Sequence, residues 1–304
     1  MKITLGQTFS FCQKGQRSNQ EDARYPDCDT PDKAQRFFVV CDGVGGSEGG
    51  EVASHTVCQA FAKAMSKVDF SKDFTNKAFN EALDAAYNAL DNSARPGTDM
   101  ATTMTFAAFH SAGATLCHIG DSRIYQIRPT QGIIYRSDDH SQVNQMVHSG
   151  IITPEQARDH PQRNVITRYM APVADDESRC MATVVQTRDV KKGDYFLLCT
   201  DGVLQQLSDD QLQDVVADNC DDKEKIKKMA EQCKDSTDNN TAILIPIEQV
   251  ELLAGEACYK EGADTGETTV KTNPFVMEVS EMESVAGQHA GNPIMKMIKK
   301  LFGK

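Results

Sequence analysis

Residues 37–46 read FFVVCDGVGG: an apolar, β-favouring run stops at Asp42, and glycines follow it. A short apolar run that ends at a turn signal predicts a buried strand. The same pattern returns at residues 194–202, DYFLLCTDG, where the apolar run stops at Asp201. We therefore expect two buried strands, each of which delivers an aspartate at its end.

A third strand completes this pattern. Residues 241–247 are apolar and β-favouring, and Asp238 stands shortly before them. Strand ends on a rigid sheet can hold catalytic groups in fixed geometry. Asp42, Asp201 and Asp238 are thus candidates for one site, although each by itself is also compatible with an ordinary turn.

Helical and strand patterns alternate along the rest of the chain. Residues 51–65 and 69–92 carry apolar side chains at helical spacing. Residues 102–128 are rich in β-branched and aromatic types with glycine turns between them, which is typical of antiparallel strands. Shorter helices are expected at 141–150 and after the Thr-Pro pair at 153–154. Periodicity alone predicts a mixed α/β fold with antiparallel hairpins.

The composition bears on partners and compartment. The formal net charge is −12 over 304 residues, whereas a nucleic-acid binder needs a cationic surface, so we expect no nucleic-acid partner. Ten cysteines are scattered without a CxxC pair, and those inside apolar runs are expected to be buried free thiols. The N-terminus carries no apolar secretory segment. We expect a cytoplasmic protein with reduced thiols.

The aspartates suit hard divalent cations. Magnesium and manganese prefer carboxylate and carbonyl oxygens and keep several waters. Asp42 followed by Gly43 provides a carboxylate and an accessible backbone carbonyl, and the pair Asp201-Gly202 provides the same two groups. We expect a metal site, although a glycine-rich turn taken alone is more often a plain connector.

A series of motifs carries a family resemblance. They are GQRSNQEDA (15–23), VVCDGVGGSEGGEVAS (39–54), ATTMTFA (101–107), HIGDSRIYQI (118–127), DDHS (138–141), GIITPEQARDHPQRNVITR (150–168), GDYFLLCTDGVLQQLSDDQL (193–212) and TDNNTAIL (237–244). In this order and spacing the chain resembles the metal-dependent protein phosphatase (PPM, type 2C) family in its compact bacterial form. The resemblance covers roughly residues 5–247.

The resemblance implies a fold and a two-metal centre. The fold would be a four-layer α-β-β-α sandwich with two central antiparallel sheets, formed by a phosphatase domain over residues 1–247. Asp42 matches the carboxylate that bridges two Mn²⁺ or Mg²⁺ ions. Gly43 matches a backbone carbonyl ligand of one ion, and Asp201 and Asp238 match the remaining ligands of the other.

The resemblance also assigns the surrounding residues. Glu21 and Asp22 match acids that bind or orient metal waters, and Arg17 matches the arginine that grips the substrate phosphate. Asp121 matches a carboxylate at a third, weaker metal site. A guanidinium can fork onto two phosphate oxygens, and two cations can activate a water for direct attack without a covalent intermediate.

Two positions depart from the pattern. Where many relatives place a histidine near the DGxGG turn, this chain has Ser47, a poor general acid at neutral pH. His55 and His140 are the nearest alternatives, and a metal-bound water is another. The position four residues after Asp201, often acidic in relatives, is Gln205, which weakens the expectation of a third ion.

The implied function is a phosphatase for phosphoserine and phosphothreonine in proteins, opposing a bacterial eukaryote-like Ser/Thr kinase. A catalytically silent phosphoprotein-binding scaffold and a dedicated regulatory phosphatase are the alternatives. Residues 144–168, the flap segment, match a region that borders the active site in relatives. Its Arg158, Arg163 and Arg168 are expected either to steer phosphoproteins, with Arg163 as the candidate substrate-binding residue, or to be plain surface charges.

The C-terminal part differs from the rest of the chain in composition. Residues 248–292 are expected to form a flexible acidic linker. Within 293–304 apolar side chains recur at helical spacing with lysines between them, which predicts a basic amphipathic helix. Such a helix can lie on an anionic membrane surface, here the inner membrane, or dock in a partner's groove; it could equally pack on its own domain.

Overall fold

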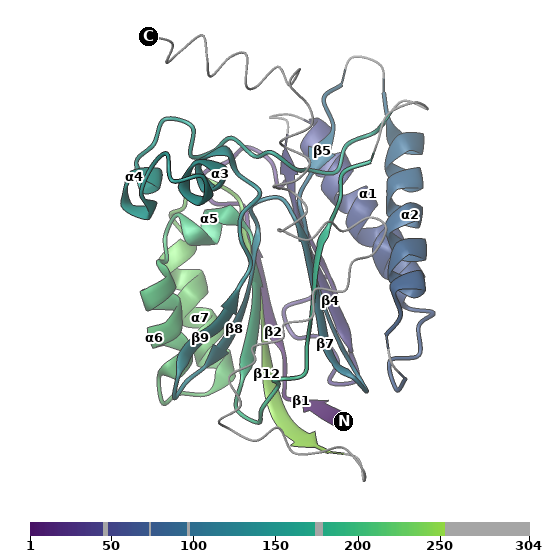
Figure 1. Ribbon diagram of the computed structural model, residues 1–304, viewed down its shortest axis with the longest axis vertical. Helices are drawn as coiled ribbons and strands as arrows, with labels where there is room; N and C mark the ends of the chain where they lie inside the picture. Colours follow the sequence, from purple (N-terminus) through teal and green to yellow (C-terminus); the bar gives the residue numbers. More distant parts are fainter. Residues whose placement is uncertain (45–47, 73, 96–97, 174–178, 253–304) are drawn as a thin grey trace.

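The computed structural model describes residues 1–44, 48–72, 74–95, 98–173 and 179–252 (Figure 1). The expected C-terminal helix and most of the expected linker lie outside these residues. No helix among the described residues has the length and apolar character that a membrane crossing requires.

Two sheets form the centre of the molecule, and the strand pairings of the described residues are antiparallel. The first sheet has the order β1 (Lys2–Leu5), β12 (Asn240–Glu251), β11 (Tyr195–Cys199), β8 (Arg123–Arg128) and β9 (Gly132–Arg136), with β2 (Phe9–Gln13) also on β12. The second has the order β10 (Thr183–Thr187), β7 (Gly113–Ile119), β6 (Met104–His110), β4 (Phe37–Val44) and β3 (Asp22–Tyr25), with β5 (Ala101–Thr102) on β4.

Helices cover both outer faces (Figure 1). The second sheet packs against α1 (Glu48–Met65) and α2 (Asn76–Ser93), and the first against α6 (Asp209–Ala217) and α7 (Asp222–Cys233). Three short helices lie at one end of the sandwich: α3 (Gln142–His148), α4 (Pro154–Arg158) and α5 (Asp201–Leu204). The expected α-β-β-α layering is confirmed.

The alternation of side chains along β4 explains these layers. Phe38 and Val40 belong to the core between the two sheets, whereas Val39 and Cys41 belong to the core beneath α1 and α2. All four side chains are fully buried. Because successive residues of a strand point to opposite faces, a strand covered on both faces is apolar throughout. This is why residues 37–41 show no polar alternation.

Several element boundaries differ from the sequence expectation. β4 does not stop at Asp42 but continues to Val44, because Gly43 and Val44 pair with β5. The first long helix begins at Glu48 rather than Glu51.

The second long helix begins at Asn76 rather than near Asp69, because the side chain of Thr75 caps it by accepting a hydrogen bond from the Ala78 N–H. The last strand continues past Ile247 to Glu251, because it pairs there with β1. Neither the cap nor the long-range pairing is visible in local periodicity.

Candidate metal centre

β3 and β4 place two carboxylates side by side. Asp22 lies directly opposite Asp42 in this antiparallel pair, and directly opposed residues project to the same face of a sheet. The apolar residues before Asp42 are fully buried, so a shift in register would expose them. The register of the two strands therefore sets the separation of these acids.

The other sheet contributes two more carboxylates. β11 ends at Cys199, opposite Ala242 of β12, so the chain just after β11 meets the chain just before β12. Asp201 begins α5, and Asp238 precedes β12. The carboxyl groups of Asp201 and Asp42 lie within hydrogen-bonding reach of each other. The expected gathering of strand-end aspartates from both sheets is present.

These carboxylates strongly perturb one another. Burial, with the charges of Asp201 and Asp238 adding to it, raises the pKa of Asp22 to about 8. Burial and the neighbouring carboxylates raise the pKa of Asp42 well above its usual range; Asp42 keeps some exposed surface, but protein atoms surround its carboxyl group. Burial and then Asp201 raise the pKa of Asp121 to about 7. Like charges held together in a low dielectric favour protonation or a bound cation.

The donor set fits divalent cations that retain water. Among the described residues no three His, Cys, Asp or Glu side chains are spaced to ligate one ion directly. Magnesium-type sites use one or two carboxylates per ion and fill the remaining positions with water. Oxygen-only donors with perturbed pKa values match that arrangement. Each of the two ions expected from the sequence would therefore be coordinated by few protein atoms and mostly by water.

Close backbone packing explains the glycines that follow two of the aspartates. A Cβ on Gly43 would lie 2.3 Å from the Gly50 carbonyl oxygen and 2.7 Å from that of Glu21. A Cβ on Gly202 would lie 1.9 Å from the Asn239 carbonyl oxygen. No side chain fits at such distances, so both Asp-Gly pairs, one within β4 and one at the start of α5, are locked against neighbouring backbone. The glycines hold the aspartates in place whether or not an ion is bound.

Asn239 is a buried hub that the sequence expectation missed. Its Oδ1 accepts from the Glu21 N–H at 2.8 Å, and its Nδ2 donates to the carbonyls of Lys14 and Asn19 at 2.8 and 2.9 Å. Its own N–H donates to Asp238 Oδ1 at 2.9 Å. Asn239 thereby ties the loop that carries Glu21 to the strand end that carries Asp238. The Asp-Asn-Asn run was the available signal.

Threonine hydroxyls support the carboxylates from behind. The N–H of Asp42 donates to Thr103 Oγ1 at 3.0 Å, and that hydroxyl lies 2.8 Å from Ser122 Oγ. Thr200 Oγ1 donates to Asp22 Oδ2 at 3.0 Å. Thr103, Ser122 and Thr200 are fully buried. Their only signal in the sequence was their position inside the motifs.

Arg17 lies beside Asp238, and Glu21 is held through Asn19 and Asn239. Nη2 of Arg17 donates to Asp238 Oδ2 at 2.7 Å, and the arginine side chain remains 47% exposed. Glu21 is buried, and its Oε1 accepts from Asn19 Nδ2 at 2.9 Å. The guanidinium is therefore anchored at the edge of the carboxylate cluster with a face toward solvent.

His140 is bonded through both ring nitrogens. The Gly120 N–H donates to its Nδ1 at 3.1 Å, and its Nε2 lies 2.9 Å from Thr183 Oγ1. Burial, with a stacked His118 ring whose centroid is 4.3 Å away, lowers the pKa of His140 to about 2. An imidazole that stays neutral, with both ring nitrogens in hydrogen bonds, cannot act as a general acid at neutral pH. The structure thus favours a structural role for His140.

The other positions considered for leaving-group protonation are placed differently. Ser47 lies outside the described residues. His55 is on α1, with its Nδ1 3.2 Å from the Glu51 carbonyl, and it lines a cavity of about 420 Å³ that Asp22 also lines. His55 therefore shares a cavity with an acid of the centre.

Gln205 faces the metal centre. Its Nε2 donates to Asp201 Oδ2 at 3.3 Å, and its Oε1 accepts from Thr237 Oγ1 at 3.3 Å. The threonine hydroxyl orients the amide so that its NH₂ group points at Asp201. An amide NH₂ group, rather than a carboxylate oxygen, therefore faces Asp201 from this position.

The arginines of the flap segment diverge. Arg163 is exposed, with its N–H on the His160 carbonyl at 3.0 Å. Arg168 Nη1 lies 3.5 Å from His140 Nε2. The side chain of Arg158 lies outside what the structure describes. No hydrogen bond or ion pair of the described residues joins Arg163 to the carboxylate cluster.

Comparison with known proteins identifies relatives. The family model described as protein phosphatase 2C matches residues 14–239. The chain is 31% identical over 197 residues to the serine/threonine protein phosphatase PstP of Mycobacterium tuberculosis, covering 64% of this chain and 36% of PstP. It is 38% identical over 119 residues to the protein phosphatase PhpP of Streptococcus pneumoniae, covering 38% of this chain and 45% of PhpP. The chain thus spans less than half the length of these curated relatives.

Solved structures agree with the sequence relatives. The crystal structure of M. tuberculosis PstP superposes with a TM-score of 0.66 at 28% identity, covering 81% of this chain and 100% of that one. The catalytic domain of PstP in complex with two manganese ions superposes with a TM-score of 0.64 at 26% identity, covering 82% and 100%.

The raised carboxyl pKa values predict how the metal-free protein responds to pH. Acids whose folded pKa exceeds the ordinary 3.8 hold protons that the unfolded chain has already lost, so stability falls as pH rises toward the folded values. We expect the Tm in EDTA to fall by about 5 °C between pH 6.5 and 8. The buried histidines with a lowered pKa, His118 and His140, act in the opposite direction near their ordinary pKa of 6.5, so the fall in Tm measures the excess of the carboxylate effect. Manganese should abolish the fall.

The matched control is Asp42→Asn, which removes one of the converging charges. Its metal-free Tm should change less over the same window, as differential scanning fluorimetry can measure. A wild-type Tm that stays constant or rises with pH in EDTA would show that the carboxylates do not repel one another.

Proposed function

The chain belongs to the protein phosphatase 2C family, and we propose that it is a metal-dependent enzyme that hydrolyses phosphoserine and phosphothreonine in proteins. The observation that carries this proposal is the meeting of Asp42 and Asp201, one from each sheet, within hydrogen-bonding reach in a cluster of mutually repelling carboxylates. Such a cluster lowers its own free energy when cations bind.

The proposed division of labour follows the positions of the side chains. Asp42, Gly43, Asp201 and Asp238 would hold two ions, with Asp22 and Glu21 orienting their waters. When bound, divalent cations supply a water nucleophile that is acidic enough at neutral pH and neutralise charge on the phosphate. The buried hydroxyl of Thr200 keeps Asp22 oriented. Asn239 keeps Glu21 and Asp238 in register.

Arg17 would bind the substrate phosphate. Its anchor on Asp238 fixes one edge of the guanidinium, and the half-exposed remainder faces solvent. A planar fork held in this way loses little conformational freedom when a phosphate arrives. Arg163, exposed on the flap segment, would contact the substrate outside the phosphate.

A third ion would bind weakly. Burial and then the charge of Asp201 raise the pKa of Asp121, and two carboxylates that repel each other in this way support an additional cation between them. The NH₂ group of Gln205 opposes it by donating to Asp201. We propose two well-held ions and a third held only at high metal concentration.

Phosphorylated proteins are the proposed substrates, and a Ser/Thr kinase with its targets the proposed partners. We also propose that residues 293–304 bind an anionic membrane surface as a basic amphipathic helix, so that a cytoplasmic enzyme becomes peripheral to the membrane. The support is the spacing of apolar and lysine residues in the sequence.

The central test is manganese-dependent hydrolysis of a phosphothreonine peptide. Asp42→Asn and Asp201→Asn should each lower kcat by at least about 100-fold, because each removes charge that holds the cations. Asp69→Asn is the control. Asp69 is an exposed acid whose carboxylate contacts Ser71 and Lys72, so this variant should leave the rate unchanged. Equal activity in all proteins, or activity without a divalent metal, would contradict the mechanism.

The third ion can be tested by Gln205→Glu, which exchanges an amide donor for a carboxylate beside Asp201. The weakest manganese site should tighten by about tenfold in isothermal titration calorimetry. Gln206→Glu adds the same charge at the neighbouring exposed residue and should not change that site. If both variants bind manganese alike, Gln205 does not limit the third ion.

The role of the C-terminal residues can be tested by deleting residues 285–304. Co-sedimentation with vesicles that contain anionic lipid should be lost, while hydrolysis of the soluble peptide should be kept. Vesicles of neutral lipid serve as the control, because lysines contribute little to binding there. Unchanged binding to anionic vesicles would remove the membrane proposal and leave docking to a partner.

A further inference from the structure

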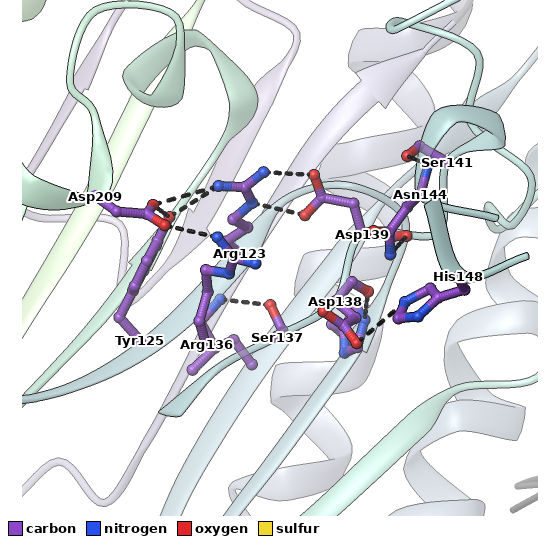
Figure 2. Close-up of polar contacts among 12 residues, drawn as sticks. Arg123, Tyr125, Arg136, Ser137, Asp138, Asp139, Ser141, Asn144, His148 and Asp209 are labelled. Atoms are coloured by element: carbon purple, nitrogen blue, oxygen red, sulfur yellow. Dashed lines mark hydrogen bonds and ion pairs between the residues drawn. The ribbon is translucent and has the colours of Figure 1, made fainter. Parts of the chain in front are cut away.

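Arg123 lies at the centre of a partly buried polar network beside the metal centre (Figure 2). Its Nε and Nη2 donate to Oδ1 and Oδ2 of Asp139 at 2.6 and 2.7 Å, a bidentate fork. We propose that Arg123 is a positioning residue that sets the flap segment relative to the metal centre and so determines how protein substrates are held. This inference rests on the proposed phosphatase function.

Residues 139–142, the flap root, hold both ends of the flap segment. At its start, the Asp139 carbonyl accepts from Asn144 Nδ2 at 2.9 Å, and the Ser141 side chain caps α3 (Figure 2). At its end, the Gln142 N–H donates to the carbonyl of residue 165, and the N–H of residue 167 donates to that of residue 140. Whatever fixes Asp139 therefore fixes where the flap segment leaves and rejoins the domain.

Arg123 connects the flap root to the rigid part of the domain. It begins β8, and its Nη1 donates to the Tyr125 hydroxyl at 3.1 Å and lies 3.5 Å from Asp209 Oδ1. Asp209, in the first turn of α6, also accepts from Tyr125 and from Arg136 Nη1, at 2.8 and 2.6 Å. Figure 2 shows the guanidinium between the two aspartates. The arginine is thus braced on the side away from the flap.

The flap root is bonded to the metal centre as well. The His140 N–H donates to the Gly120 carbonyl at 2.9 Å, and the Gly120 N–H donates back to His140 Nδ1. Gly120 precedes Asp121, and Ser122 reaches Asp42 through Thr103. A shift of the flap root would therefore move the flap segment relative to these carboxylates.

The flap segment offers contacts that only a large substrate can use. Ile151 is 58% exposed, Val165 is 44% exposed, and Arg163, two residues before Val165, is exposed as well. A small aryl phosphate needs only the metal centre and Arg17. A polypeptide that extends beyond its phosphate can also contact these side chains. Arg123 should therefore affect peptide substrates selectively.

The test is Arg123→Lys, which keeps the charge and removes the bidentate fork. The value of kcat/KM for a phosphothreonine peptide should fall about tenfold, mainly through KM, while kcat/KM for p-nitrophenyl phosphate should stay within about twofold. Asn144→Ala leaves the ion pair intact and cuts its link to α3, so it should shift the ratio in the same direction. An unchanged ratio in both variants would overturn the proposal.

Arg128→Lys is the matched control. Arg128 lies on the same strand and forks onto Asp194 at 2.7 and 3.0 Å, without a bond to the flap root. It should lose similar thermal stability and leave the substrate ratio unchanged. If it shifts the ratio as much as Arg123→Lys does, general destabilisation explains the effect and the proposal fails.

Hydrogen–deuterium exchange separates this proposal from the proposed function. Amides of residues 142–168 should exchange faster in Arg123→Lys than in Arg128→Lys, whatever the activity. A wild-type protein without activity on either substrate would overturn the phosphatase function, and the substrate role of Arg123 with it. Equal exchange in the two variants would overturn the positioning role itself.

Discussion

Electrostatic repulsion among Asp22, Asp42, Asp121 and Asp201 is the constraint on which the rest of the structure depends. Burial and mutual proximity raise the pKa of each of these acids. A chain that gathers such charges loses stability unless protons or cations balance them. The fold must hold the carboxylates together against this force. Its two-sheet core and its buried hydroxyl and amide supports do so.

The support comes from both sheets at once. The fully buried run before Asp42 holds β4 in register, and the antiparallel pairing of β11 with β12 brings Asp201 near Asp238. Backbone atoms pack so closely on Gly43 in β4 and on Gly202 in α5 that neither segment can rearrange without moving its neighbours. Carboxylates held by strand pairing and close backbone packing are organised before any ion binds, which would lower the cost of binding one.

The same end of the sandwich organises the surroundings of the centre. The flap root is bonded on one side to the loop that carries Asp121 and on another to Arg123. The carboxylate cluster and the flap segment thus share one hydrogen-bonded connection.

The sequence by itself determined the local features: the buried strands that lead to Asp42 and Asp201, the helical stretches and the order of the motifs. The motif order in turn indicated the family and, with it, the sandwich fold. Only the tertiary structure decided the partners. Three features depend on contacts between residues far apart in the chain. They are the hydrogen bonds that converge on Asn239, the bidentate pair of Arg123 with Asp139, and the hydrogen bonds that keep His140 neutral. Local periodicity carries no record of such contacts, because it reports which face of an element is buried and not what buries it.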